Sequence, residues 1–152
     1  MNEGNKFLCK TDHAAVWYTL LGKKSVLNSL YSLEVGMEKF AEFFKKDFKQ
    51  EKVRTIAYKN AIALVAKQKF YVAISFMLLA EKLDVALQVA LDRLKDPILA
   101  LLMCRVWDPE GKKGCLEGLL DKWFIERGTK FNDPYLINIG FWLKKEFVKS
   151  VN

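Results

Sequence analysis

The segment KVRTIAYKNAIALVAK, residues 52–67, determines the fold class of this chain. Its apolar residues are spaced by three and four positions, which places them on one face of an α-helix. That face comprises Val53, Ile56, Ala57, Ala61, Leu64 and Val65. Asn60 is the one polar residue on it, and we expect its amide to be buried and bonded to neighbouring backbone, with a more specific contact as the alternative. Lys52, Lys59 and Lys67 fall outside the face and are expected to point into solvent.

The segment that follows, FYVAISFMLLAEK at residues 70–82, is apolar on all sides of a helical projection. A helix with this pattern needs packed neighbours on more than one flank. We therefore predict that residues 70–82 form a central helix.

Capping signals divide the rest of the chain into further helices. Asp12 is expected to cap a helix over residues 14–21, which Gly22 ends because glycine adopts the left-handed conformation readily. Asp96-Pro97 and Asp133-Pro134 each combine an N-cap with proline at the first helical position. The other helices are predicted near residues 24–33, 37–48, 84–94, 115–127 and 134–147, with Gly128 ending the helix at 115–127.

The helix predicted at residues 37–48 is rich in aromatic side chains on one side. They are Phe40, Phe43, Phe44 and Phe48, with Met37 beside them. We expect these side chains to lie in the core, because an aromatic stripe at helical spacing is typical of a buried face.

Small residues recur at corresponding places in the middle of the chain. Ala61, Ala73, Ala86 and Ala100 are separated by 12, 13 and 14 residues. With about nine helices and short joints, this spacing predicts an all-α fold of short antiparallel helical hairpins, stacked as an α-solenoid-like single domain over residues 1–152. An irregular helical bundle is the alternative, since no repeat of fixed length is present.

The composition indicates a soluble globular protein. The chain has 152 residues, of which 51% are hydrophobic and 28% charged, and this balance excludes disordered and disulfide-scaffold classes. No uncharged run approaches the ~18 residues of a membrane span. The first residues lack the layout of a signal peptide, and the three cysteines, at positions 9, 104 and 115, have no framework spacing. We predict a reducing, cytoplasmic location.

The net charge of +7 favours an acidic partner if the charges gather on one surface. The densest cluster along the chain is Lys45, Lys46, Lys49 and Lys52. We regard these four lysines as candidate partner-binding residues, with the solvated face of a helix as the alternative. A nucleic-acid-binding tract would be more concentrated, so nucleic acid is not expected as a partner.

Residues suited to catalysis or metal binding are sparse. His13 is the single histidine, so a catalytic triad or a Cys–His pair would have to be built around it. Cys9 and His13 can share a helix face, but zinc needs more ligands, and Cys104 and Cys115 form no CxxC-type pair. We therefore predict no enzyme activity, no metal and no cofactor.

Several short segments occur in an order and spacing that is similar to a known family. The pattern includes Trp17-Tyr18, Asp47-Phe48, Lys69-Phe70, Leu83 and Leu99-Ala100-Leu101. The residues with expected structural roles in it are Trp17, Arg54, Lys59, Asn60, Ala61, Ala73, Phe76, Ala80, Ala86 and Ala100. Over about residues 12–107 the chain resembles the helical region of the RAVE complex large subunit and its animal relatives, the rabconnectin or DmX-like proteins.

The resemblance implies a non-enzymatic scaffold that helps to regulate the assembly of the vacuolar-type proton ATPase and the acidification of organelles. The family is one of long cytosolic proteins in which WD-repeat propellers precede a helical region. Implied partners are ATPase subunits, a smaller companion subunit and, in fungi, the adaptor shared with SCF ubiquitin ligases. The implied location is cytoplasmic, with peripheral recruitment to endosomal and vacuolar membranes.

The chain has no propeller sequence, and its last predicted helix lacks a polar cap. We therefore expect it to be a piece of a longer WD-repeat protein. A vesicle-coat or other trafficking solenoid is the first alternative function, and a nucleic-acid-binding helical domain is the second.

Overall fold

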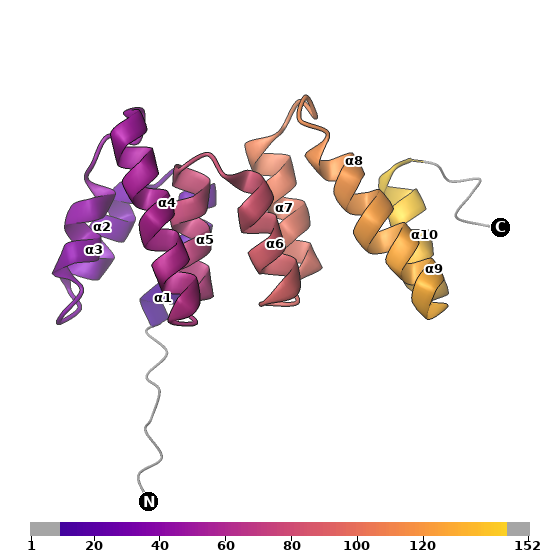
Figure 1. Cartoon of the computed structure of the whole chain (residues 1–152), viewed down its shortest axis with the longest axis horizontal. Coiled ribbons are helices and arrows are strands. Elements are labelled where there is room, and N and C mark those ends of the chain that lie inside the picture. The colour runs from indigo at the N-terminus through magenta and orange to yellow at the C-terminus, as the bar shows by residue number, and fades with distance from the viewer. Residues whose placement is uncertain (1–9, 146–152) are drawn as a thin grey trace, which may run out of the picture. The chain divides into compact units, whose positions relative to one another are not determined.

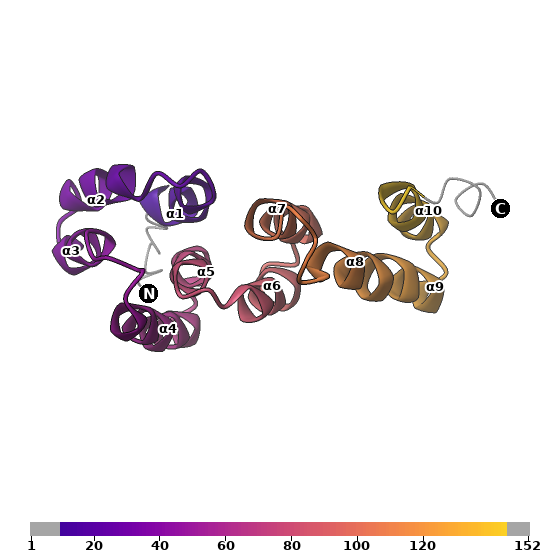
Figure 2. The ribbon, with the colours of Figure 1, turned by 90° about the horizontal axis from the view of Figure 1, so that it is seen from above.

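The computed structural model describes residues 10–145, which form helices joined by short turns (Figure 1, Figure 2). No strand occurs among these residues, which confirms the all-α prediction. Their contacts divide the chain into two compact units, Met1–Lys95 and Asp96–Asn152. The arrangement of the helices as one solenoid-like domain over residues 1–152 stays a prediction.

The helices lie close to their predicted positions. The first unit contains α1 (Lys10–Leu20), α2 (Lys24–Ser32), α3 (Glu38–Phe44), α4 (Glu51–Ala66), α5 (Phe70–Leu79) and α6 (Leu83–Asp92). The second contains α7 (Pro97–Trp107), α8 (Cys115–Leu119), the π-helix η1 (Leu120–Glu126), α9 (Arg127–Phe131) and α10 (Pro134–Leu143). Because α8, η1 and α9 follow one another without a break, they form one rod, and the described part of the chain holds nine helices, as predicted.

Helix α5 is the central helix of the first unit, as its all-round apolar pattern predicts. Every side chain from residue 72 to residue 78 is buried. Even Ser75 is fully buried, and its hydroxyl donates a hydrogen bond to the Tyr71 carbonyl oxygen at 3.1 Å. Helices α1, α4 and α6 all pack against α5 (Figure 2). The first unit is therefore organised around this helix.

The aromatic side chains of α3 pack onto α5. The ring centroids of Phe43, Phe44 and Phe40 lie 5.0, 5.2 and 5.9 Å from that of Phe76. Tyr31 of α2 stacks on Phe44 with the centroids 5.6 Å apart. Each such aromatic pair contributes about 0.5–1.5 kcal/mol beyond its buried area. The cluster joins α2, α3 and α5.

Helix α3 is shorter than the helix predicted at residues 37–48, because it ends at Phe44. The backbone N–H of Lys49 donates to Asp47 Oδ1 at 3.0 Å, so the Asp47 side chain supports a turn in place of further helix. Phe48 is nevertheless buried, with its ring 5.5 Å from that of Phe43. The aromatic spacing correctly predicts Phe43, Phe44 and Phe48 as core residues, but Met37 and Phe40 are only half-buried, and the helix is shorter than predicted.

The prediction that Asp12 caps the first helix is wrong. Helix α1 begins at Lys10, which places Asp12 within its first turn. Its carboxylate accepts a hydrogen bond from the Tyr31 hydroxyl at 3.1 Å and pairs with Lys69 Nζ at 3.5 Å. Asp12 therefore links α1 to α2 and to the residue that precedes α5.

Helix ends in this chain depend less on glycine than we predict. Gly22 follows α1 with a φ of 69°, as expected. Among the described residues, five that are not glycine have φ between 52° and 62°: Gln68, Glu81, Lys95, Asn132 and Lys145. After three of them the next N–H bonds back to a carbonyl five residues earlier: Lys69 to Leu64 and Lys82 to Met77, both at 2.9 Å, and Asp133 to Gly128 at 2.8 Å. This is the Schellman motif, formed here without glycine.

Lys95→Gly should stabilise the protein. A left-handed conformation costs an L-residue about 1–2 kcal/mol that glycine avoids, against about 0.5–1 kcal/mol of added freedom in the unfolded chain. We expect the free energy of unfolding to rise by about 0.5–1 kcal/mol in urea titrations followed by circular dichroism. Arg93→Gly is the matched control, because Arg93 is also exposed but has a φ of −98° at the end of α6. Its free energy of unfolding should fall by about 0.5–1 kcal/mol. Equal effects at the two positions would contradict backbone strain at Lys95.

The Asp-Pro signals of the second unit are confirmed. Asp96 accepts a hydrogen bond from the Leu99 N–H at 2.9 Å at the start of α7. Asp133 accepts from the Tyr135 and Leu136 N–H groups, each at 3.1 Å, at the start of α10. Helix α10 ends at Leu143, and the last two residues of the predicted helix at 134–147 lie outside the described residues.

The prediction that Gly128 ends the helix at residues 115–127 is wrong. The rod continues through Gly128 to Phe131, and Asn132, with a φ of 52°, ends it. Gly128 is buried because α10 passes close to it. A Cβ atom added there would lie only 2.8 Å from Cγ1 of Ile137.

Gly140 on α10 has the same role from the other side of this contact. A Cβ atom added to it would lie 2.7 Å from Cγ1 of Ile125 and 3.1 Å from Cβ of Phe124. The salt bridge between Lys144 and Asp121, at 2.7 Å, adds a second link between α10 and η1. The two glycines therefore set how closely α10 approaches the rod.

Gly140→Ala should destabilise the protein by about 1–3 kcal/mol, because the added methyl group meets Ile125 and Phe124 in a packed contact. Gly118→Ala is the control within the same rod, since an added Cβ atom there has nothing within 4 Å. It should stabilise the protein by about 0.5–1 kcal/mol through helix propensity. Urea unfolding of both variants measures the contrast, and a Gly140→Ala protein as stable as Gly118→Ala would rule out the close approach.

Candidate functional site

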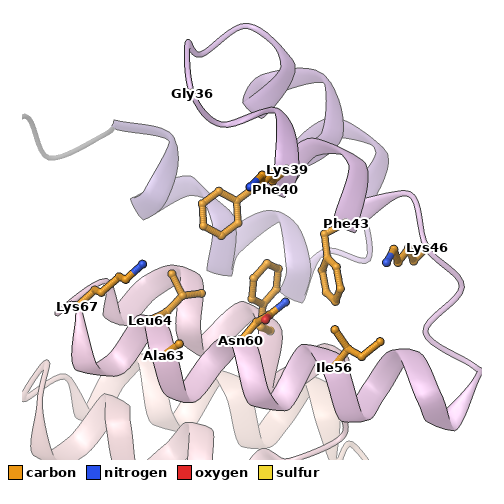
Figure 3. Close-up of a pocket in the computed structure, with 11 residues that line it drawn as sticks. Gly36, Lys39, Phe40, Phe43, Lys46, Ile56, Asn60, Ala63, Leu64 and Lys67 are labelled. Atoms are coloured by element: carbon orange, nitrogen blue, oxygen red, sulfur yellow. The ribbon is translucent and has the colours of Figure 1, made fainter.

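The first unit carries a groove of about 490 Å³ between α3 and α4 (Figure 3). Its apolar lining comes from three helices. Phe40 and Phe43 project from α3 toward α4, Ile56 and Leu64 line it from α4, and Phe76 comes from α5. Ile56 is 43% exposed although it belongs to the predicted apolar face. The groove therefore offers apolar surface to solvent.

The groove exists because α4 buries a narrower stripe than its apolar spacing predicts. The buried residues of α4 are Ala57, Ala61 and Leu64. The prediction that Asn60 is buried between helices is wrong, because Asn60 is exposed and its side chain extends into the groove (Figure 3). Periodicity shows which side of a helix is apolar, but it does not show how far a neighbouring helix covers that side.

The groove is bordered by positive charge. Lys39, Lys46 and Lys67 belong to its lining, and no acidic residue does. Figure 3 shows Lys67 at one end, Lys46 at the other and Lys39 on the α3 side between them. The Lys46 ammonium group lies 5.2 Å from the centre of the Phe43 ring, a distance typical of a cation–π contact.

Glu38 is the acidic residue next to Lys39 in the chain, and it is directed to the start of its own helix. Its carboxylate accepts a hydrogen bond from the Gly36 N–H at 3.2 Å. Hydrogen bonds from the backbone N–H groups of Glu38 and Gly36 hold the pKa of this carboxyl below its usual value. Its carboxylate is therefore held at the turn that precedes α3.

The four lysines predicted to bind a partner are all exposed, and they lie on the segment between α3 and the first turn of α4. Only Lys46 also lines the groove. Lys24, which the sequence pattern does not single out, joins this basic surface from α2. Its ammonium group donates to the Lys46 carbonyl oxygen at 2.7 Å and lies 4.7 Å from the centre of the Phe48 ring. The role of the four lysines in binding stays a prediction.

The residues of the family pattern occupy two kinds of environment. Those with at most 5% exposure are Ala61, Ala73, Phe76, Ala80, Ala86 and Ala100. Arg54 pairs with Glu81 at 3.4 Å and so connects α4 to the turn after α5. Trp17 is 43% exposed, and Lys59 is exposed as well.

Titratable side chains do not converge on a reaction centre in the described residues. His13 is exposed, and its ring lies 4.2 Å from that of Tyr71. No group of three or more His, Cys, Asp or Glu side chains that could hold a metal occurs between residues 10 and 145, and Cys9 lies outside this range. Within the same range, no helix is both long and apolar enough to span a membrane.

Cys104 and Cys115 lie with their sulfur atoms 3.2 Å apart. Cys104 is fully buried, and this burial, with the Cys115 side chain as a second cause, raises the pKa of its thiol far above the usual value. A raised pKa keeps the thiol protonated and unreactive, because the thiolate is the nucleophile. Cys104 is therefore a structural cysteine.

The low reactivity of the Cys104 thiol can be measured by alkylation with iodoacetamide under reducing conditions at pH 8. We expect Cys104 to react at least about tenfold more slowly in the native protein than in 6 M guanidinium chloride, since each unit of raised pKa lowers the thiolate fraction about tenfold. Peptide mass spectrometry separates Cys104 from the other two cysteines. A native rate equal to the unfolded rate would contradict its burial.

The fold and the site together define an all-α protein of packed helices with an apolar groove bordered by lysines. Residues 10–152 match the family described as "RAVE protein 1 C terminal". The chain belongs to this family, which confirms the resemblance found in the sequence motifs.

Three relatives illustrate the similarity. The chain is 33% identical over 139 residues to "Regulator of V-ATPase in vacuolar membrane protein 1" of Saccharomyces cerevisiae, and 30% identical over 144 residues to the protein of the same name in Schizosaccharomyces pombe. It is 30% identical over 146 residues to "DmX-like protein 1" of Mus musculus. In the same order, these matches cover 88%, 92% and 88% of the chain. The chain in turn spans only 10%, 11% and 5% of the length of these relatives.

Proposed function

We propose that this chain is a non-enzymatic scaffold within a regulator of vacuolar-type proton ATPase assembly, and so of organelle acidification. The observation that carries this function is the family match over residues 10–152, together with two yeast relatives whose names describe a regulator of the V-ATPase in the vacuolar membrane. The exposed apolar groove bordered by Lys39, Lys46 and Lys67 supports a binding role.

The proposed mechanism is recognition of an acidic protein surface. Lys45, Lys46, Lys49 and Lys52 are exposed along one short segment, and Lys24 lies beside it. Charges arranged in this way accelerate the encounter with an oppositely charged partner more than they strengthen the final complex. The partners are ATPase subunits or other subunits of a RAVE-type complex, met in the cytoplasm or at the surface of endosomes and vacuoles.

Affinity capture from cytosol tests this function. The immobilised chain should retain vacuolar ATPase subunits, identified by mass spectrometry, and retention should fall at least about fivefold between 50 and 300 mM salt because exposed charges are screened. Charge reversal of Lys45, Lys46, Lys49 and Lys52 to glutamate should produce a similar loss at low salt.

The matched control reverses four exposed lysines elsewhere on the chain, Lys82, Lys95, Lys122 and Lys130. This variant changes the net charge by the same amount and should keep its ATPase subunits. Retention of vesicle-coat subunits in place of ATPase subunits would reassign the chain to trafficking, and retention of RNA at physiological salt would reassign it to nucleic-acid binding. Equal losses in the two charge-reversed variants would show that the four lysines have no specific role.

A further inference from the structure

We propose that the groove between α3 and α4 is a docking site for an acidic amphipathic helix of a partner protein. The site is distinct from the lysine segment, with which it shares only Lys46. It is defined by its apolar lining, its length along α4 and the position of its three lysines.

The lining of the groove suits apolar side chains. Ile56 is 43% exposed, and Phe40 is partly exposed above the buried rings of Phe43 and Phe76. A volume of about 490 Å³ lies within the roughly 300–1,000 Å³ of typical binding pockets, so the groove can accept several side chains at once. Covering this surface would remove apolar area from water, which is the main driving force of association.

The length of the groove matches about three turns of helix. It extends along α4 from Ile56 to Lys67, the residue that follows the helix, and the eleven steps between them at 1.5 Å each span about 16 Å. A helix that lies along it would present apolar residues at positions i, i+4 and i+7.

A helix fits the groove better than an extended peptide. The described residues contain no strand, so there is no sheet edge to which an extended peptide could add. Over an apolar floor, an extended peptide would leave its backbone N–H and C=O groups without partners, at a cost of about 1–3 kcal/mol for each group that becomes buried. A helix satisfies these groups internally and offers only its side chains.

The charges at the groove favour an acidic occupant. Lys67 and Lys46 lie at opposite ends, with Lys39 between them on the α3 side (Figure 3). A helix with glutamate or aspartate on both sides of its apolar stripe would place carboxylates near these lysines. A basic helix of the same shape would meet like charges, which disfavour binding.

The burial of the aromatic rings argues against nucleic acid as the occupant. Phe43 and Phe76 are only 7% and 1% exposed, so neither offers an open face to a base. Single-stranded nucleic acids bind through stacking on exposed aromatic side chains. Phe40 is the one partly exposed phenylalanine in the lining, and a single ring does not provide the successive stacking surfaces that a single strand uses.

A designed peptide provides the probe. It has 16 residues, with leucine at three positions spaced i, i+4 and i+7 and glutamate at the positions that flank this stripe, and it carries fluorescein at its N-terminus. The matched peptide has lysine in place of every glutamate. We expect the acidic peptide to bind the 152-residue chain in fluorescence anisotropy titrations at least about twentyfold more tightly than the basic peptide.

Two pairs of variants locate the binding site. Ala63→Glu places a larger, acidic side chain in the groove and should weaken binding of the acidic peptide at least tenfold, whereas Ala66→Glu, also exposed on α4 but outside the lining, should stay within about threefold of the parent protein. Reversal of Lys39, Lys46 and Lys67 to glutamate should also weaken binding at least tenfold. Reversal of Lys45, Lys49 and Lys52 should have less than about a threefold effect. Circular dichroism confirms that each variant is folded.

Three results would overturn the proposed site. The first is equal binding of the acidic and basic peptides. The second is loss of binding with the Lys45, Lys49 and Lys52 reversal but not with the groove reversal. The third is displacement of the peptide by a uridine 16-mer or by phosphatidylserine vesicles, if these competitors bind the parent protein but not the Ala63→Glu variant. Displacement by the oligonucleotide would assign the groove to nucleic acid, and displacement by the vesicles would assign it to lipid. Because the assay contains no ATPase component, its outcome is independent of the role in ATPase regulation.

Discussion

The first unit depends on the packing of aromatic rings around the buried Phe76 side chain. Three phenylalanine rings of α3 pack around it, while the helix that carries it packs against α1, α4 and α6. Because α3 has only seven residues, its rings reach α5 without covering the adjoining edge of α4. The same packing that stabilises the unit therefore leaves Ile56 and Asn60 open to solvent, so the groove is a by-product of how the core is filled.

The helices themselves could be predicted from the sequence because their signals are local. The Asp-Pro pairs at α7 and α10 cap the backbone within three residues, and the uniformly apolar α5 can be stable only in the middle of a packed unit. The sequence predictions of helix ends and caps are wrong where an acidic side chain or a glycine can take more than one structural role. Asp12 bonds across helices in place of capping, Asp47 forms a turn, and Gly128 provides space for α10.

The candidate site was only partly predictable, for a related reason. Exposure of the lysine segment follows from its charge, and burial of Phe43 and Phe44 follows from their spacing. The groove, in contrast, depends on how much of α4 remains uncovered, which is a property of the packed unit and has no signature in one helix. Lys39 and Lys67 are far apart in the sequence, so only the folded chain shows that they border the same surface.

The left-handed residues at the helix joints have a consequence for how this fold can diverge. Gln68, Glu81 and Lys95 occupy a conformation that glycine favours, yet the joints form because backbone hydrogen bonds and the packing of the adjacent helices impose their shape. The penalty for an unbranched L-residue is modest, about 1–2 kcal/mol, because it arises from the Cβ atom, and it is larger for β-branched residues. Exchanges among glycine, asparagine and unbranched residues at these joints therefore leave the architecture intact, so the sequences of homologous joints can diverge while the helices on either side keep their places.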